Sequence, residues 1–223
     1  YFDTFVGPDD HALPPDNVQL DDEREVAHRT SPTNIGLGML AAVAARDLGF
    51  IDDGALVDRL ERTLSTIERL EQHEGHLLNW YDTRTLRPLM PAYVSTVDSG
   101  NLAGALLTVA VSTRTLAPEV SARANALFEA MDFGFLFDRK RQLFAIGFRL
   151  SDGDGAGQLD ASHYDLLASE ARLASFLAIA RGDVDETHWF RLGRPVTGVR
   201  GAPVLLSWSA TMFEYLMPLL LMR

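Results

Sequence analysis

The chain has no cysteine and only one lysine, Lys140, among its 223 residues. Without thiols it can form neither disulfides nor thiolate-ligated metal sites. The remaining basic residues are arginines, scattered through a sequence whose net charge is −11. Binding of nucleic-acid phosphates needs a concentrated basic face, which this distribution lacks. These absences predict a neutral ligand and no nucleic-acid partner.

Long hydrophobic runs are also absent. The most apolar stretch, at 214–222, contains Glu214 and Pro218 and is far shorter than the roughly 20 residues of a spanning helix. We therefore expect no membrane span in this segment. A content of 47% hydrophobic and 23% charged residues is typical of one globular core. Because the chain begins at Tyr1, without an initiator methionine, we expect it to be part of a longer protein.

Three segments share a layout that we interpret as a repeat. Residues 31–49, 97–116 and 164–183 each open on polar residues and continue into ten or more residues that are nearly all apolar or small. Such a pattern predicts helices that are buried nearly all round. Residues 207–222 predict the start of a fourth unit, and a recurring step of this kind indicates a repeat architecture.

Amphipathic, charged segments at 53–73 and 117–132 lie between the apolar ones. An inner ring of apolar helices alternating with an outer ring of amphipathic helices is an all-α toroid of the (α/α)6 type, incomplete in this chain. We expect one small β-hairpin near 133–150, where apolar residues alternate at period two around Arg139–Lys140–Arg141. In such a toroid the polar ends of the inner helices meet at one mouth, where ligand sites lie.

Glu170 is the most informative single residue. On a helix over 164–180, its neighbours at three and four positions are all apolar: Leu166, Leu167, Leu173 and Ala174. A carboxyl group in such surroundings has a raised pKa, which suits a general base, or is paired with a cation from another helix. Glu214 repeats the pattern, with buried backbone groups or an arginine as the structural alternative.

The connection at 79–101 combines aromatic side chains with acids, amides and arginines. Aromatic faces stack on the C–H surface of sugars while polar groups take up the hydroxyls, so this mixture favours a carbohydrate cleft over a merely packed loop. The predicted sugar-binding residues are Trp80, Asp82, Arg84, Tyr93, Asp98, Asn101, Trp208 and Glu214.

Motifs for cofactors and metals fail on inspection. The match to GxGxxA at 36–41 lies inside an apolar helix with no strand before it. The acidic stretch 152–163 lacks two ligands that a calcium loop requires, and it predicts a flexible loop. We therefore expect neither a metal nor a cofactor.

The chain resembles the glycoamylase-like domain of bacterial cyclic β-1,2-glucan synthases over nearly its whole length. The motifs that carry the resemblance are LPPDN, AHRTSPTNIGL, NWYDTRTLRPL, YVSTVDSGNLAG, YDLLASEARLASFLAIARGDV, HWFRLGRP and SWSATMFEYLMPLLLM. The resemblance implies a toroid that closes linear β-1,2-glucan into rings by an anomer-inverting transglycosylation. It also implies that residues 1–223 are one segment of that domain, without its C-terminal part, in a larger membrane-anchored protein at the cytoplasmic face of the inner membrane.

Within the resemblance, the LLASEARLAS motif places the general base on Glu170. The family's second carboxylate, the acid, lies beyond the MFEYLMP motif and is absent from this chain. An inverting reaction needs both groups, so the segment alone is expected to be inactive.

Other functions remain open at this point. One is a non-catalytic module that binds or holds glucan, and another is an exo-acting glucosidase. A third is a helical repeat that binds protein. An incomplete ring leaves apolar surfaces without neighbours, so a homodimer is also expected.

Overall fold

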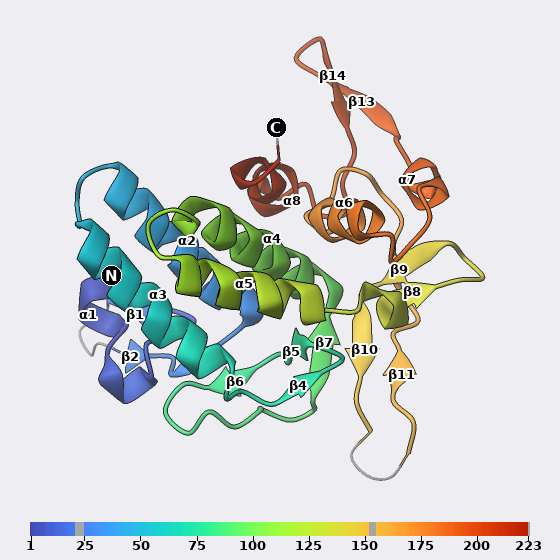
Figure 1. Ribbon diagram of the computed structural model, residues 1–223. Helices are drawn as coiled ribbons and strands as arrows, with labels where there is room; N and C mark the ends of the chain where they lie inside the picture. The colour runs from blue at the N-terminus through green and yellow to red at the C-terminus, as the bar shows by residue number, and fades with distance from the viewer. Residues whose placement is uncertain (21–24, 152–154, 223) are drawn as a thin grey trace.

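The computed structural model describes residues 1–20, 25–151 and 155–222 (Figure 1). Two helical layers dominate it. The helices are α1 (Phe2–Phe5), α2 (Pro32–Asp47), α3 (Asp53–Ile67), α4 (Thr96–Thr113), α5 (Pro118–Ala130), α6 (Arg172–Arg181), α7 (Thr187–Arg191) and α8 (Met212–Leu216), with 3-10 turns at Pro8–Asp10, Phe133–Leu136 and Met217–Leu220.

Helices α2, α4 and α6 form the inner layer, and α3 and α5 form the outer one. Helix α4 packs against α2, α5 and α6, while α3 packs against α2 and α5. In Figure 1, α4 lies between α2 and α6, with α5 in front of it. The alternation of apolar inner and amphipathic outer helices is confirmed for these elements. Closure into a complete ring stays a prediction.

The inner helices begin where side chains cap their first turns. The Ser31 hydroxyl accepts a hydrogen bond from the Asn34 amide at the start of α2, and Ser95 accepts one from the Asp98 amide at the start of α4. Caps of this kind satisfy amide groups that have no partner within the helix. They fix the residue at which each of these two helices begins, and so the place of the polar residues in its first turn.

The sequence predicts an all-α fold with one small β-hairpin, but the structure contains more strands than that. Fourteen short strands pair in six antiparallel sheets within the described residues. The strands are β1 (Val18–Gln19), β2 (Glu25–Val26), β3 (Arg29–Thr30), β4 (Gln72–His73), β5 (His76–Leu77), β6 (Tyr81–Asp82), β7 (Tyr93–Ser95), β8 (Phe137–Asp138), β9 (Leu143–Ala145), β10 (Gly147–Arg149), β11 (Gln158–Leu159), β12 (His163–Tyr164), β13 (Val196–Val199) and β14 (Ala202–Leu205). They were missed because strands of two to four residues show little periodicity.

The hairpin near 133–150 is confirmed in its centre. Strands β8 and β9 pair in the register Phe137↔Phe144, although 133–136 form a 3-10 turn and β10 leaves to pair with β7. Within the expected loop at 152–163, residues 152–154 lie outside the described residues. Part of the remainder forms β11, which pairs with β10.

The helix expected over 164–180 begins only at Arg172. Leu167 and Gly193 form a backbone hydrogen bond of 2.9 Å, which draws the preceding residues into extended backbone. The Ser169 hydroxyl then accepts from the Ala171 amide at 3.1 Å, a local bond that competes with helix formation. Glu170 therefore stands in the turn before α6, and the prediction that it lies within a helical apolar stripe was wrong.

The fourth apolar segment is also shorter than expected. Of residues 207–222, only α8 and the following 3-10 turn are helical. Pro218 has no amide hydrogen to continue the α-helical pattern. No helix in the described part of the chain is long and apolar enough to cross a bilayer.

Candidate functional site

The N-terminal ends of the three inner helices meet at one end of the layer. The Thr33 amide of α2 donates to Asp98 of α4 at 3.3 Å, and the Asn101 side-chain amide donates to the Thr33 hydroxyl at 3.0 Å. Gly100 of α4 lies directly against Ala174 of α6. The expectation that the polar ends of the inner helices gather at one end is confirmed for α2, α4 and α6.

A groove of about 580 Å³ opens beside these helix ends, which is within the range of ligand sites. It is lined by Arg29, Asn79, Trp80, Leu89, Met90, Pro91, Tyr93, Ser95 and Asp98. Three predicted sugar-binding residues, Trp80, Tyr93 and Asp98, are thus brought together. The groove combines an indole, a phenol, a carboxylate and a guanidinium, which matches the mixture that a sugar requires.

Glu170 is half-buried beside the same cluster. Burial raises the pKa of its carboxyl group, and the negative charges of Glu214 and Asp98 raise it further. Hydrogen bonds with the backbone of Glu170 itself and with the Ser169 hydroxyl, which donates to Glu170 Oε2 at 3.4 Å, oppose the rise only in part. Asp98 both lines the groove and acts on Glu170, so the proposed base and the groove belong to one electrostatic neighbourhood.

Two tyrosines connect the groove with Glu170. Burial raises the pKa of Tyr93 to about 12, with the charge of Asp160 and a hydrogen bond to it adding to the rise. Burial also raises the pKa of Tyr164, which is further raised by the nearby charges of Glu170 and Asp98. Both phenols therefore stay protonated to higher pH than a free tyrosine, and that of Tyr93 is hydrogen-bonded with Asp160.

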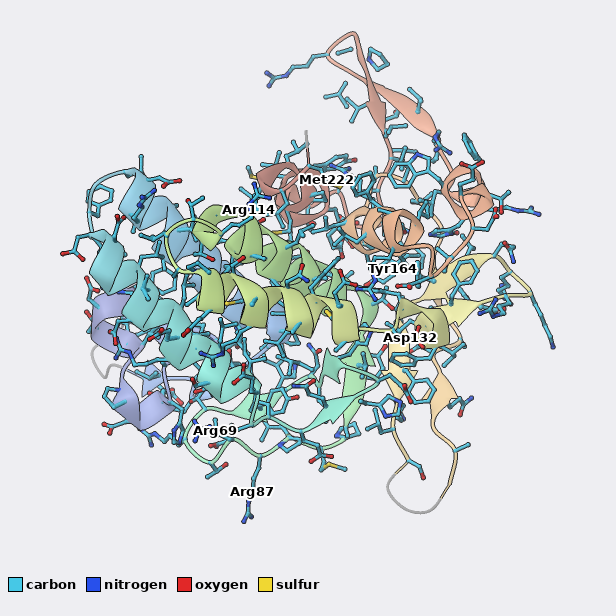
Figure 2. All side chains as sticks on the ribbon, viewed as in Figure 1. Arg69, Arg87, Arg114, Asp132, Tyr164 and Met222 are labelled. Atoms are coloured by element: carbon cyan, nitrogen blue, oxygen red, sulfur yellow. The ribbon has the colours of Figure 1, made fainter. Side chains whose placement is uncertain are left out.

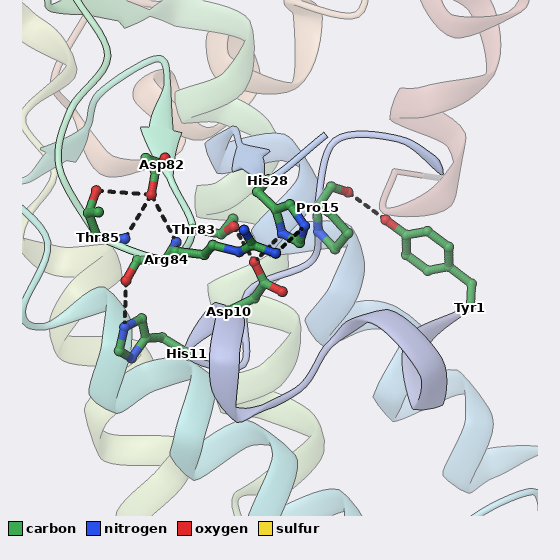
Figure 3. A network of polar contacts seen from close by, with 9 residues as sticks. All are labelled: Tyr1, Asp10, His11, Pro15, His28, Asp82, Thr83, Arg84 and Thr85. Atoms are coloured by element: carbon green, nitrogen blue, oxygen red, sulfur yellow. Dashed lines mark hydrogen bonds and ion pairs between the residues drawn. The ribbon is translucent and has the colours of Figure 1, made fainter. Parts of the chain in front are cut away.

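Asp82 and Arg84 belong to a separate polar network (Figure 3). Asp82 Oδ1 accepts from the amides of Arg84 and Thr85 at 3.0 and 2.7 Å, while Arg84 Nη2 donates to His28 Nε2 at 2.8 Å and His28 Nδ1 lies 2.8 Å from Asp10. Burial tends to raise the pKa of Asp82, but its hydrogen bonds with Thr85 and Arg84 outweigh burial and lower it. Both side chains help to fold the loop, and their contact with sugar stays a prediction.

Asn101 and Trp208 lie at opposite extremes of exposure. Asn101 is 1% exposed, and its side-chain oxygen has no hydrogen-bond partner within the described residues. Trp208 is 57% exposed, and its indole donates to Asp165 at 2.9 Å, which ties it to the segment leading to Glu170. Only Trp208 of these two presents a surface that a ligand could reach directly.

Glu214 caps its own helix. Its carboxylate accepts from the amides of Ser209 and Thr211, at 3.0 and 2.8 Å, and from the Thr211 hydroxyl at 2.9 Å. The Glu214 amide donates back to Thr211, which completes a capping box. Burial tends to raise the pKa of Glu214, but these hydrogen bonds outweigh it and lower the pKa. The geometry thus matches the structural alternative in part: Glu214 satisfies backbone groups, but those of the exposed residues Ser209 and Thr211.

Glu214→Gln is expected to lower the free energy of unfolding at neutral pH by about 1 kcal/mol, because glutamine can keep the capping-box hydrogen bond but loses the charge that strengthens it. A carboxyl group whose pKa is lowered by folding stabilises the protein above its ordinary pKa, and this stability is lost as the pH falls through the lowered value. The difference from the unaltered protein, measured by urea unfolding, should therefore shrink toward pH 3. Glu25→Gln, at an exposed position in β2, is the control, and equal stability of both variants at neutral pH would contradict the prediction.

The geometry adds three residues that the sequence analysis missed: Arg29, Asp160 and Tyr164. Arg29 lines the groove, Asp160 bonds to Tyr93, and Tyr164 lies beside Glu170. Tyr164 stands in the LLASEA-containing segment and could have been noted there. The other two are brought in by strand pairing, which has no local signal.

Within the described residues, no group of three or more His, Asp or Glu side chains is arranged to hold a metal ion.

Comparison with known proteins finds similarity to a cyclic β-(1,2)-glucan synthase and to endo-β-1,2-glucanases. Residues 18–124 match a family described as a protein of unknown function, DUF3131. The chain is 31% identical to the cyclic β-(1,2)-glucan synthase NdvB of Rhizobium meliloti, in an alignment of 351 positions that covers all of this chain. It spans only 12% of the length of that relative.

Solved structures share the fold at low identity. An endo-β-1,2-glucanase from Chitinophaga pinensis, in complex with sophorotriose and glucose, matches 95% of this chain with a TM-score of 0.78 and 16% identity. A mutant endo-β-1,2-glucanase from Talaromyces funiculosus, in complex with β-1,2-glucan, matches 96% with a TM-score of 0.76 and 12% identity. The chain spans 53% of each of these two structures. It is thus related over its whole length to a segment of a bacterial cyclic β-(1,2)-glucan synthase, and it has the fold of endo-β-1,2-glucanases.

Proposed function

We propose that this chain binds linear β-1,2-glucan in the groove beside Trp80, Tyr93 and Asp98, as part of a domain that closes the glucan into rings. The observation that carries the proposal is the half-buried Glu170, whose pKa is raised next to the groove-lining Asp98. The sequence similarity to a cyclic β-(1,2)-glucan synthase and the β-1,2-glucan bound by a protein of the same fold support the choice of ligand.

In the proposed reaction Glu170 acts as the general base. It removes the proton from a hydroxyl group of the glucan chain, directly or through an intervening substrate hydroxyl, as the resulting oxygen attacks the anomeric carbon of a distant glucose unit. The glycosidic bond on the opposite face breaks, its oxygen takes a proton from a general acid, and the anomeric configuration inverts. The two carboxyl groups of such a pair stand about 6.5–9.5 Å apart. We assign the acid to another part of the longer protein to which this chain is proposed to belong. That longer protein is called the parent protein below.

Two alternatives use the same groove. A glucan-holding module would bind without turnover, and an exo-acting glucosidase would release glucose from a chain end.

The parent protein is proposed to work as a larger assembly at the cytoplasmic face of the inner membrane.

Product analysis on linear β-1,2-glucan separates these functions. The parent protein, incubated with linear glucan, is expected to yield rings that lack a reducing end, as judged by mass spectrometry and reducing-sugar assay. Release of glucose would replace the cyclisation proposal by hydrolysis. Glucan binding without any new product would leave the binding module.

A further inference from the structure

Arg29 covers one face of a groove-lining indole. Its guanidinium carbon lies 5.2 Å from the centroid of the Trp80 ring, within the range of a cation–π contact. Both residues line the groove next to the ends of the inner helices. The ring has two faces, so a guanidinium on one of them leaves the other for a ligand.

The register of two short strands produces this contact. Strand β3 pairs with β6 so that Arg29 stands opposite Asp82 and Thr30 opposite Tyr81. Trp80 comes one residue before β6 and two before Asp82, and its ring lies against Arg29. Thr30 and Tyr81 are on the other face and are fully buried. The buried pair thus fixes which residues face the groove.

Asp16 fixes the guanidinium in turn. Arg29 Nε and Nη2 donate to Asp16 Oδ2 at 3.2 and 3.0 Å. The Asp16 amide donates to the Arg29 carbonyl at 2.7 Å, which sets the two backbones side by side. The other carboxylate oxygen of Asp16 accepts from the Asn34 side chain, in the first turn of α2, at 3.4 Å. A chain of contacts therefore runs from α2 through Asp16 and Arg29 to Trp80.

We propose that Asp16 and Arg29 are positioning residues that hold the Trp80 indole as a platform with one free face, on which a glucose ring of the glucan stacks. The inference rests on the proposed function, because it takes the groove to be the glucan site. A neutral sugar suits the free face, since its C–H groups meet the negative π face of the ring. A planar guanidinium suits the covered face, because it can stack on the indole while its Nε and Nη2 both donate to Asp16 Oδ2.

Lysine at position 29 cannot do both. Its ammonium group is a point charge without a planar fork, so Arg29→Lys keeps the charge but loosens the indole. Asp16→Asn removes the anionic partner and is expected to act through the same contact. The matched controls are Arg87→Lys, whose side chain points away from the molecule in Figure 2, and Asp9→Asn at an exposed position.

The test measures binding of linear β-1,2-glucan by calorimetry and by the quenching of Trp80 fluorescence. All variants keep Trp189 and Trp208, the quenching that remains in Trp80→Phe is subtracted to leave the Trp80 signal, and circular dichroism checks that each is folded. We expect Arg29→Lys and Asp16→Asn each to weaken binding about three- to tenfold and to reduce the glucan-induced quenching. The double variant should be no weaker than the weaker single variant, because both act on one contact. The two controls should bind glucan as tightly as the protein without these substitutions.

The outcomes separate the inference from the proposed function. Binding that Trp80→Ala abolishes, but that Arg29→Lys and Asp16→Asn leave unchanged, would overturn the positioning role and keep the groove as the glucan site. Additive losses in the double variant would also overturn it. If the unsubstituted protein shows no glucan binding, the proposed function fails, and the inference fails with it.

Discussion

Glu170→Gln in the parent protein is expected to lower the turnover of linear β-1,2-glucan by about 10²- to 10⁴-fold, the usual contribution of a general base. Glutamine keeps the shape of the side chain but cannot take up a proton. The dissociation constant for glucan should stay within about twofold, because the groove residues Trp80, Tyr93 and Asp98 are untouched. Steady-state kinetics and calorimetry on the same preparation measure both quantities.

The raised pKa of Glu170 gives two further signs to check. A base must be ionised, so the rate should fall as the pH drops through the raised value, and this acidic limb should lie above the ordinary glutamate pKa of about 4.3. Folding favours the protonated form of a group whose pKa it raises, so the ionised carboxylate destabilises the fold at neutral pH. Glu170→Gln should therefore raise the melting temperature at pH 7 while it removes activity.

Glu186→Gln is the matched control, since Glu186 is exposed at the start of α7 and makes no cap hydrogen bond. It should leave turnover, binding and melting temperature unchanged. Retained turnover in Glu170→Gln would remove Glu170 from the mechanism. Loss of turnover together with a lowered melting temperature would instead mark Glu170 as a structural acid.

The helical layers could be predicted from the sequence because their signals are local. The apolar run of α4 and the amphipathic run of α3 each give their type of burial directly, and Pro32 and Pro118 stand at the first positions of their helices, where proline is favoured. The direction of the Glu170 pKa shift was also expected, although for a reason that was only half right. Burial raises it, but in a turn before α6 rather than within a helical stripe.

The site could be predicted only in part because its contacts are not local. Trp80, Tyr93 and Asp98 share one connection in the sequence, and they also share the groove. Arg29 reaches Trp80 through a strand pair of two residues, whose register depends on which side chains the core buries. Glu214 also has mostly apolar neighbours at three and four positions in the sequence, yet its capping box gives it a pKa shift of the opposite direction. Apolar neighbours in the sequence therefore cannot distinguish a carboxyl group with a raised pKa from one that caps a helix.

Gly100→Ala is expected to destabilise the protein by about 3 kcal/mol, at the upper end of the range for overpacked cores. A Cβ atom at position 100 would lie 2.6 Å from the Ala174 Cβ atom and 2.8 Å from the Ala174 amide nitrogen. The obstacle is the backbone of α6, which cannot move aside as a flexible side chain would. Helices α4 and α6 would have to separate, and the free energy of unfolding measured in urea should fall accordingly.

Gly54→Ala makes the same chemical change where space is free, and this pairing isolates the effect of helix contact. Its Cβ atom would meet only the Asp52 carboxylate, at 3.5 Å, at the exposed start of α3. There alanine should stabilise the helix by about 0.5–1 kcal/mol, because glycine loses more backbone freedom on folding. Opposite signs for the two variants are therefore expected. Because Asp98 and Glu170 flank the α4–α6 contact, Gly100→Ala should also weaken turnover in the parent protein. If Gly100→Ala left the free energy of unfolding unchanged, the inner layer would be looser than these distances require.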